Sequence, residues 1–480
     1  MQTARIALKN ISVLGFSNII ISILGALILI YTARLLGESE FGKYSFAITY
    51  TSLFLVFSDF GTSQLIVREI ARNKDLANIY VANTLIIKIF TSLISIALMI
   101  SIIDVLNYPS DMVYVVFLFG IYIILDSFAL TIRSVFQSFE KMEYIAITTT
   151  IQKLLLALAT FFLLHTNYSL IKLGYLYVLV GLIDLFFGFV LLYNKFLNIK
   201  WNINITLWKR LIIESIPFSL NALFSLLFFR IDTVMLSMIK GDIAVGEYSA
   251  ASNPLLSLCG IISSVVVFVL YPIMSRFFFQ PNDSLKKLTI ISSKYMALIG
   301  FPISVGCFIL ADKFISIIYA NQYANSIVSF QILSLFVPLR LVSVVIGTLI
   351  SSINKQKTRT LIVGISALFN IILNLALIPK MASTGACIAT VLSELILYLM
   401  LVHIANTHFR ELNILKYYMK PLISSILMGI IILIFNSSNI IVTMMIAAIA
   451  YVISLAALRT FEQEDMELLN IILKRNKHAK

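Results

Sequence analysis

The sequence that decides the fold runs from Tyr31 to Lys74 and reads YTARLLGESEFGKYSFAITYTSLFLVFSDFGTSQLIVREIARNK. One apolar segment ends near Gly37, and we expect a tight turn through residues 42–44 before a second apolar segment begins. This second segment contains Asp59 and is followed by the basic residues Arg68, Arg72 and Lys74. Two apolar segments, a short turn and a basic end predict a membrane hairpin.

The composition extends this prediction to the whole chain. Of its 480 residues, 60% are hydrophobic and only 12% are charged, and the mean hydropathy is +0.98. A soluble domain carries about 25% charged residues, and a spanning helix needs about 20 mostly apolar residues. The sequence therefore predicts an all-α polytopic membrane protein with 14 spans and no separate soluble domain. The spans are expected to begin near residues 11, 44, 81, 112, 145, 172, 211, 249, 294, 324, 360, 385, 417 and 440.

The basic residues predict the orientation, because cytoplasmic loops hold an excess of Lys and Arg. With the N-terminus inside, 25 of the 36 Lys and Arg residues lie on the inner side and five on the outer side. We therefore expect a multi-pass protein of the cytoplasmic membrane with both termini in the cytoplasm. The first apolar run is expected to be a retained span rather than a signal peptide. The net charge of +13 then reflects topology and anionic lipids rather than nucleic acid.

Two short motifs recur and indicate an internal repeat. Residues 37–45 read GESEFGKYS and residues 241–249 read GDIAVGEYS, an offset of 204. Residues 138–141 (SFEK) correspond to 352–355 (SINK) at an offset of 214. An offset of six spans preserves orientation and predicts two parallel lobes, an arrangement found in transporters. We expect an N-lobe at 1–197, a C-lobe at 198–408, and spans 13 and 14 with a cytoplasmic tail at 409–480.

Charged residues inside the spans are the candidate functional residues, because a charge at mid-bilayer costs at least ~2.5–3.5 kcal/mol. At ~1.5 Å per residue, Arg340 lies deepest, followed by Arg230 and Lys153. An Arg- and Lys-lined cavity suits an anionic substrate. Lys88 and Arg34 also have a structural interpretation, snorkelling to the interface or, for Arg34, capping a helix C-terminus, and the acids could be protonated or paired structural groups. The candidate cavity cations are Arg340, Arg230, Arg34, Lys153 and Lys88, and the candidate coupling or gating acids are Asp59, Asp126, Asp184 and Glu394.

Other site chemistries find no support in the sequence. The three cysteines lie in apolar segments without metal-ligand spacing, and the four histidines are scattered, so we expect neither a metal site nor a cofactor. The chain has no GxxxxGK[ST], HExxH or GxSxG motif, which argues against an ATP-driven motor and against common hydrolases.

The motif combination resembles a known family. The residues RLLGESEFGKY at 34–44, DFG at 59–61, VREIAR at 67–72 and RIDTVMLSMIKG at 230–241 are similar to those of Wzx-type flippases for polysaccharide or O-antigen repeat units, in the multidrug/oligosaccharidyl-lipid/polysaccharide (MOP) exporter superfamily. The resemblance implies a two-lobed, MATE-like fold with alternating access, in which a central basic cavity maps onto Arg34, Arg230 and Arg340. It also implies a polyprenyl-diphosphate-linked oligosaccharide as the substrate and a possible coupling ion.

Two alternatives remain at this stage. A multidrug or cation antiporter of the related MATE branch would need an acidic cavity. A membrane-embedded glycosyltransferase or glycan polymerase would be expected to have a sizeable loop or a carboxylate cluster. The basic intramembrane residues and short loops favour a non-enzymatic flippase over both.

Overall fold

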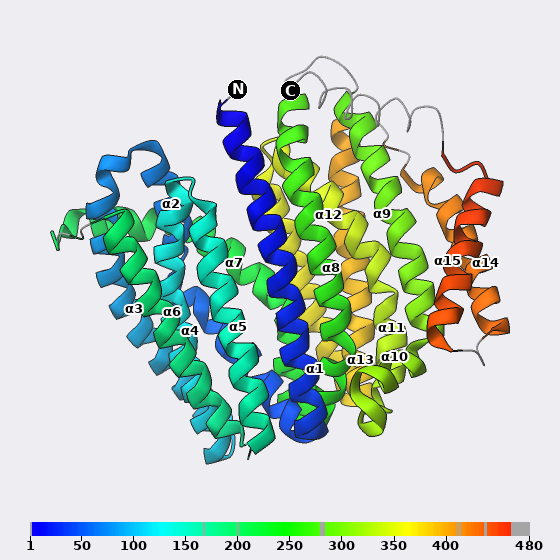
Figure 1. Cartoon of the computed structure of the whole chain (residues 1–480), viewed down its shortest axis with the longest axis horizontal. Helices are drawn as coiled ribbons and strands as arrows, with labels where there is room; N and C mark the ends of the chain where they lie inside the picture. The colour runs from blue at the N-terminus through cyan, green and yellow to red at the C-terminus, as the bar shows by residue number, and fades with distance from the viewer. Residues whose placement is uncertain are drawn as a thin grey trace. The chain divides into compact units, whose positions relative to one another are not determined.

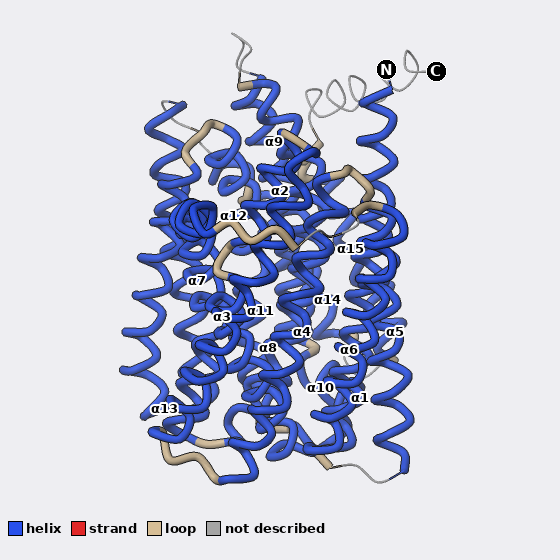
Figure 2. The backbone as a smooth tube through the Cα atoms, turned by 90° about the vertical axis from the view of Figure 1, so that its left-hand side faces the viewer, coloured by secondary structure: helices blue, strands red, loops and turns tan. Residues whose placement is uncertain are grey.

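The computed structural model describes residues 2–166, 169–197, 199, 201–278, 284–409, 412, 414–435 and 439–461. Every regular element in these ranges is helical (Figure 2), as expected where lipid cannot satisfy backbone polar groups. The α-helices are α1 Gln2–Asp59, α2 Thr62–Arg72, α3 Ala77–Val105, α4 Ser110–Ser138, α5 Met142–Thr166, α6 Leu170–Lys195, α7 Ile205–Lys240, α8 Asp242–Phe277, α9 Ser284–Ile309, α10 Ala311–Tyr319, α11 Ser326–Ser334, α12 Phe336–Ser352, α13 Gln356–Phe409, α14 Met419–Ile434 and α15 Ile440–Ala457.

The helices confirm the predicted class of membrane protein. Twelve helical segments in the described ranges are long and apolar enough to cross a membrane. Two of them are about twice the length of a single span, and each contains a residue with non-helical backbone angles, Gly37 in α1 and Ala382 in α13. Dividing each long segment at this residue gives the 14 predicted spans.

The turn of the opening hairpin does not lie where the sequence indicated. The break is at Gly37, with φ 74° and ψ 175°, and the helix resumes directly after it. A positive φ is strained for residues with a side chain, which explains glycine at this position. The expected turn at residues 42–44 was therefore wrong, since Gly42 lies inside a helix.

The chain divides into two compact units. Unit 1 comprises Met1–Ser257 and Val363–Ala386. Within it, α4 packs against α6 and α1 packs against α5, and Figure 1 shows α3–α6 side by side. Unit 2 comprises Leu258–Ile362 and Cys387–Lys480, and there α9 packs against α12 and α14. The N-lobe and C-lobe boundaries expected from the repeat stay a prediction, as does the tail, most of which lies outside the described residues.

Two glycines bring the repeated motifs into contact within unit 1. A Cβ atom on Gly42 would lie 1.9 Å from the backbone oxygen of Asp242, and one on Gly246 would lie 2.1 Å from that of Glu38. The contact is reciprocal, because Asp242 and Gly246 are Glu38 and Gly42 displaced by 204 residues. The helices after Gly37 and Gly241 therefore cross at a point where only glycine fits.

The backbone also repeats at the turns. Gly37 and Gly241 both have positive φ, at 74° and 80°. Glu140 and Asn354, which occupy equivalent places in the second motif, have φ of 58° and 61°. Sequence comparison had missed a third pair, Asn107 at φ 57° and Ala320 at φ 58°, 213 residues apart. Three matching turns at nearly one offset support the predicted repeat.

Candidate functional site

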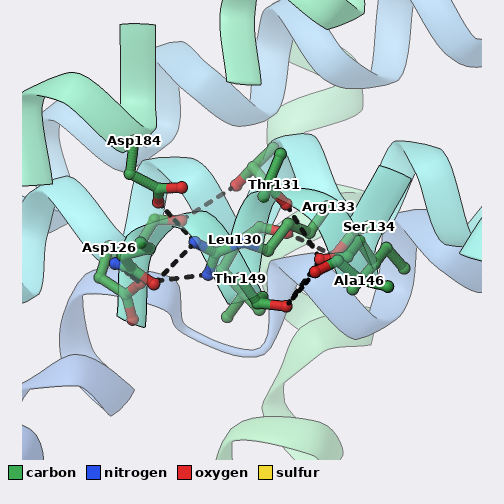
Figure 3. A network of polar contacts seen from close by, with 12 residues as sticks. Asp126, Leu130, Thr131, Arg133, Ser134, Ala146, Thr149 and Asp184 are labelled. Atoms are coloured by element: carbon green, nitrogen blue, oxygen red, sulfur yellow. Dashed lines mark hydrogen bonds and ion pairs between the residues drawn. The ribbon is translucent and has the colours of Figure 1, made fainter. Parts of the chain in front are cut away.

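Arg133 lies at the centre of a buried cluster in unit 1 (Figure 3). Its guanidinium contacts Asp126 on the same helix at 3.2 Å, Gln152 on α5 at 3.2 Å, and Asp184 on α6. Gln152 also donates to Asp126 at 3.3 Å. The candidate acids Asp126 and Asp184 thus share one cation. A pair of carboxylates with a single guanidinium carries a net negative charge, which is chemistry that can take up a proton.

Lys88 and Asp59 form a second buried cluster in unit 1. The ammonium of Lys88 lies 2.7 Å from Asp59 Oδ1 and 2.6 Å from both the Ser127 carbonyl and Thr131 Oγ1. The Lys88 side chain is only 1% exposed. An ammonium group has three N–H donors, and these contacts within the helix bundle occupy all three. Lys88, a candidate cavity cation, is therefore directed at protein groups in this structure.

The Asp-Phe-Gly motif gains a structural explanation from this cluster. Asp59 ends α1, and Phe60 and Gly61 then turn the chain with φ of 49° and 72°. A Cβ atom on Gly61 would come within 2.7 Å of the backbone of Ser215 and Ser219 in α7. The motif fixes a tight turn between α1 and α2 and holds a carboxylate beside Lys88.

Arg340 pairs with Glu394 in unit 2. The nearest atoms, Arg340 Nη1 and Glu394 Oε2, are 3.7 Å apart, with side-chain exposures of 24% and 0%. At this distance the contact is a charge interaction without a close hydrogen bond. Arg340 is thus partly neutralised, and about a quarter of its side-chain surface stays accessible.

Arg230 and Lys153 are the candidate cations without a close partner. Arg230, on α7, and Lys153, on α5, are half-buried, and neither forms a hydrogen bond or ion pair with a described residue. Arg230 lies ten residues before the end of α7, about 15 Å along the helix. Arg34, on α1, is exposed. The cations still available to a ligand are therefore fewer than the sequence indicated, and Arg230 stands out among them.

A polar network around Asp232 was missed at the sequence level. Asp232, in α7, is 1% exposed and accepts hydrogen bonds from Tyr248 at 2.8 Å and from Asn374 in α13. Asn374 also donates to Asn370 at 2.9 Å. Asn370 and Asn374, four residues apart, lie on one face of α13. Their partner Asp232 is 142 residues away from Asn374 in sequence, so no local pattern indicates the contact.

The described residues include no group of three or more His, Cys, Asp or Glu side chains that could hold a metal ion. The site candidates are thus cations and acids distributed over the helices of both units. Within a unit, the structure brings Lys88 to Asp59, Arg340 to Glu394, and Asp126 to Asp184. It leaves Arg230 and Lys153 outside these ion pairs.

Comparison with known proteins gives consistent matches. The sequence profile of the family described as "Polysaccharide biosynthesis protein" matches residues 7–278, more than half of the chain. The "Capsular polysaccharide biosynthesis protein CapF" of Staphylococcus aureus is 22% identical over 399 residues, covering 81% of this chain and 96% of that protein.

Solved structures show the same fold. The "Lipid II flippase MurJ" in an inward closed conformation superposes with a TM-score of 0.80 at 16% identity, over 92% of this chain and 98% of that one. An inward-facing MATE family multidrug resistance transporter of the MOP superfamily gives a TM-score of 0.69 at 14% identity, over 82% and 95%. At these identities the likeness establishes a MOP-type fold.

Proposed function

Because the chain belongs to the polysaccharide biosynthesis protein family, we propose that it is a flippase for lipid-linked oligosaccharides. The substrate is an oligosaccharide on polyprenyl diphosphate, moved from the cytoplasmic to the outer leaflet for cell-surface polysaccharide synthesis. The resemblance of the sequence motifs to Wzx-type flippases, the CapF relative and the MurJ-like fold support this proposal.

The observation that carries the proposal is Arg230, an intramembrane guanidinium with no ion pair or hydrogen bond to a described residue. A cation in the membrane is costly and normally faces a partner or an aqueous path. A guanidinium is well suited to the diphosphate, which it can bind through two parallel hydrogen bonds. Lys153 and the accessible part of Arg340 are further candidates, and Arg34 extends the set.

In the proposed mechanism the oligosaccharide and diphosphate cross through the protein while the prenyl chain stays in lipid. The two repeats alternate between inward and outward access, and no step makes or breaks a covalent bond. The Arg133 cluster, with carboxylates of Asp126 and Asp184, is the best candidate for a coupling proton. Glu394 is a second candidate. Asp59 is a weaker one, because its carboxylate is neutralised by Lys88.

The test compares Arg230→Gln with Arg230→Lys in cells that need this protein for their surface polysaccharide. We expect the Gln variant to lose surface polysaccharide and to accumulate lipid-linked oligosaccharide in the cytoplasmic leaflet, at unchanged protein level in the membrane. The Lys variant should retain part of the activity, because it keeps the charge but loses the bidentate geometry. Normal polysaccharide in the Gln variant would remove Arg230 from the site.

The MATE-like fold supports one alternative, an antiporter for drugs or cations. Such a protein should raise drug resistance when overproduced and should have no effect on surface polysaccharide. Purified protein that lengthened glycans would instead indicate a glycosyltransferase or polymerase. Loss of polysaccharide on deletion, without either of these activities, is the result expected for a flippase.

A further inference from the structure

The beginning of α7 and the residues before it form an amphipathic segment, residues 201–216, which we call the linker segment. The exposed large side chains are apolar: Trp201, before the helix, is 62% exposed, Ile205 73% and Ile213 54%. The exposed Lys209 lies four residues from both isoleucines, on the same helix face. The other face is buried, with Leu211 at 1% and Ser215 at 0%. Exposed large apolar side chains on one face of a helix need a covering partner.

The linker segment is held across the bundle rather than along it. Figure 1 shows the start of α7 crossing the direction of α3–α6, and Figure 2 shows it nearly end-on. Pro217, directly after the segment, lies inside the helix and accounts for a change of direction, since proline removes a backbone hydrogen bond.

Asn83 fixes the segment to α3. Its side chain donates to the Asn202 carbonyl at 2.9 Å and accepts from Asn204 N and Trp208 Nε1, both at 2.8 Å. Asn83 lies six residues after the start of α3, about 9 Å along the helix. The segment is therefore held at the depth of a helix end, where bilayer and water meet.

The segment and its neighbour α2 carry a positive charge at this depth. Lys209 is exposed and makes no hydrogen bond or ion pair with a described residue. The neighbouring carboxylates form ion pairs with other cations. Glu214 pairs with Arg68 and, at 2.7 Å, with Arg210. Glu69 pairs with Arg72 at 3.3 Å. Each carboxylate thus faces more than one guanidinium, since Glu69 also contacts Arg68 and Arg210.

We propose that the linker segment is a membrane-interface anchor that binds anionic phospholipid headgroups. An amphipathic helix with an apolar face and basic side chains lies in the interface plane, and each Lys or Arg near an anionic surface adds attraction. The anchor holds the connection between α6 and the spanning part of α7 at a constant depth. It leaves Pro217 as the joint at which the remainder of α7 can change direction.

The chain contains its own reporter for this proposal, because its two tryptophans, Trp201 and Trp208, both lie in the linker segment. The variant Trp208→Phe leaves Trp201 as the sole tryptophan of the full-length protein. In bilayers with lipids brominated at defined acyl positions, we expect strong quenching of Trp201 by shallow bromines and little quenching by bromines near the chain ends.

The preference for anionic lipid is measured in the same variant, by competition between brominated phosphatidylglycerol and unbrominated phosphatidylcholine. We expect Lys209→Gln to lower the relative association constant about fivefold, equivalent to ~1 kcal/mol per basic residue. Lys240→Gln is the matched control, because Lys240 is an exposed lysine at the opposite end of the same helix. The control should leave the constant unchanged.

Three results would overturn the proposal. Emission typical of water, insensitive to bromines at any depth, would mean that the segment does not reach the interface. Emission typical of an apolar environment but without bromine quenching would mean that protein covers the face, for example a second copy. An equal response to Lys209→Gln and Lys240→Gln would exclude anionic headgroups as the partner.

Discussion

At the residue scale, the intramembrane charges fall into two groups. Lys88 and Arg133 are buried and form ion pairs with carboxylates, Lys88 with Asp59 and Arg133 with Asp126 and Asp184. Arg230 and Lys153 make no hydrogen bond or ion pair with a described residue, although Lys153 interacts electrostatically with Asp126. Since an unpaired intramembrane charge is costly, the first group has an evident structural role, and the second needs another explanation. A substrate diphosphate supplies one.

The buried ion pair between Lys88 and Asp59 leads to a prediction about stability. Lys88→Met should destabilise the protein by about 3–5 kcal/mol, because it leaves the buried Asp59 carboxylate without its cation. The measurement is the thermal midpoint of the detergent-solubilised protein, followed by size-exclusion fluorescence.

The double variant Lys88→Met with Asp59→Asn is the control for this prediction. It should recover part of the lost stability, because the unpaired charge is removed together with its partner. A single variant as stable as the parent protein would show that the pair does not hold the helices together.

Sequence reasoning located these charges but could not pair them. The Arg133–Asp126 contact was accessible in principle, since residues seven apart lie on the same face of a helix. The contacts of Arg133 with Asp184 and of Lys88 with Asp59 join different helices, so they depend on helix packing that no local pattern encodes. The sequence therefore placed Lys88 among the candidate cavity cations without indicating that Asp59 would pair with it.

At the element scale, the helix crossing at Gly42 and Gly246 connects the repeat to the packing. The backbones meet so closely that any Cβ atom would overlap a carbonyl oxygen. The two motifs were visible in the sequence as glycine-bearing turns, and the repeat was inferred from them. Only the structure shows that the second glycine of each motif lies at a helix contact and not in a turn.

The helix crossing predicts that substitutions at Gly42 and Gly246 destabilise the protein more than a substitution at Gly37. Gly42→Val and Gly246→Val should each lower the thermal midpoint and abolish surface polysaccharide, because the overlapping atoms belong to backbone that cannot move aside. Gly37→Ala should cost about 1–3 kcal/mol from backbone strain alone, because φ 74° with ψ 175° is a region that essentially only glycine adopts. No atom lies within 4 Å of its Cβ position, so no overlap adds to this strain.

Gly25→Val is the matched control for the crossing, because Gly25 is helical and has open space around its Cβ position. It should behave nearly like the parent protein. Valine tolerated equally at positions 25, 42 and 246 would mean that the crossing does not form in the membrane.

At the scale of the whole molecule, the number of spans followed from the sequence because apolar length is a local property. All 14 predicted spans have a helical counterpart, including the two pairs joined within α1 and α13. The lobe boundaries depend instead on contacts between distant segments. Residues 363–386 group with the first half of the chain, and no periodicity in the sequence indicates this.

The orientation of the molecule is a separate prediction, which rests on the distribution of Lys and Arg. Single cysteines are introduced into a variant in which Cys259, Cys307 and Cys387 are replaced by alanine. Single cysteines at positions 39 and 240 should react with an impermeant thiol reagent in intact cells. Those at positions 195 and 357 should react only after the cells are permeabilised. The two pairs lie on opposite sides because an odd number of spans separates them: one between 195 and 240, and three between 240 and 357. Reaction of position 357 in intact cells would invert the proposed topology and would place the linker segment, and the Arg68 and Arg72 end of α2, at the outer surface. The diphosphate would then reach Arg230 from the opposite side, so this measurement decides which side of the membrane the linker segment and the basic end of α2 face.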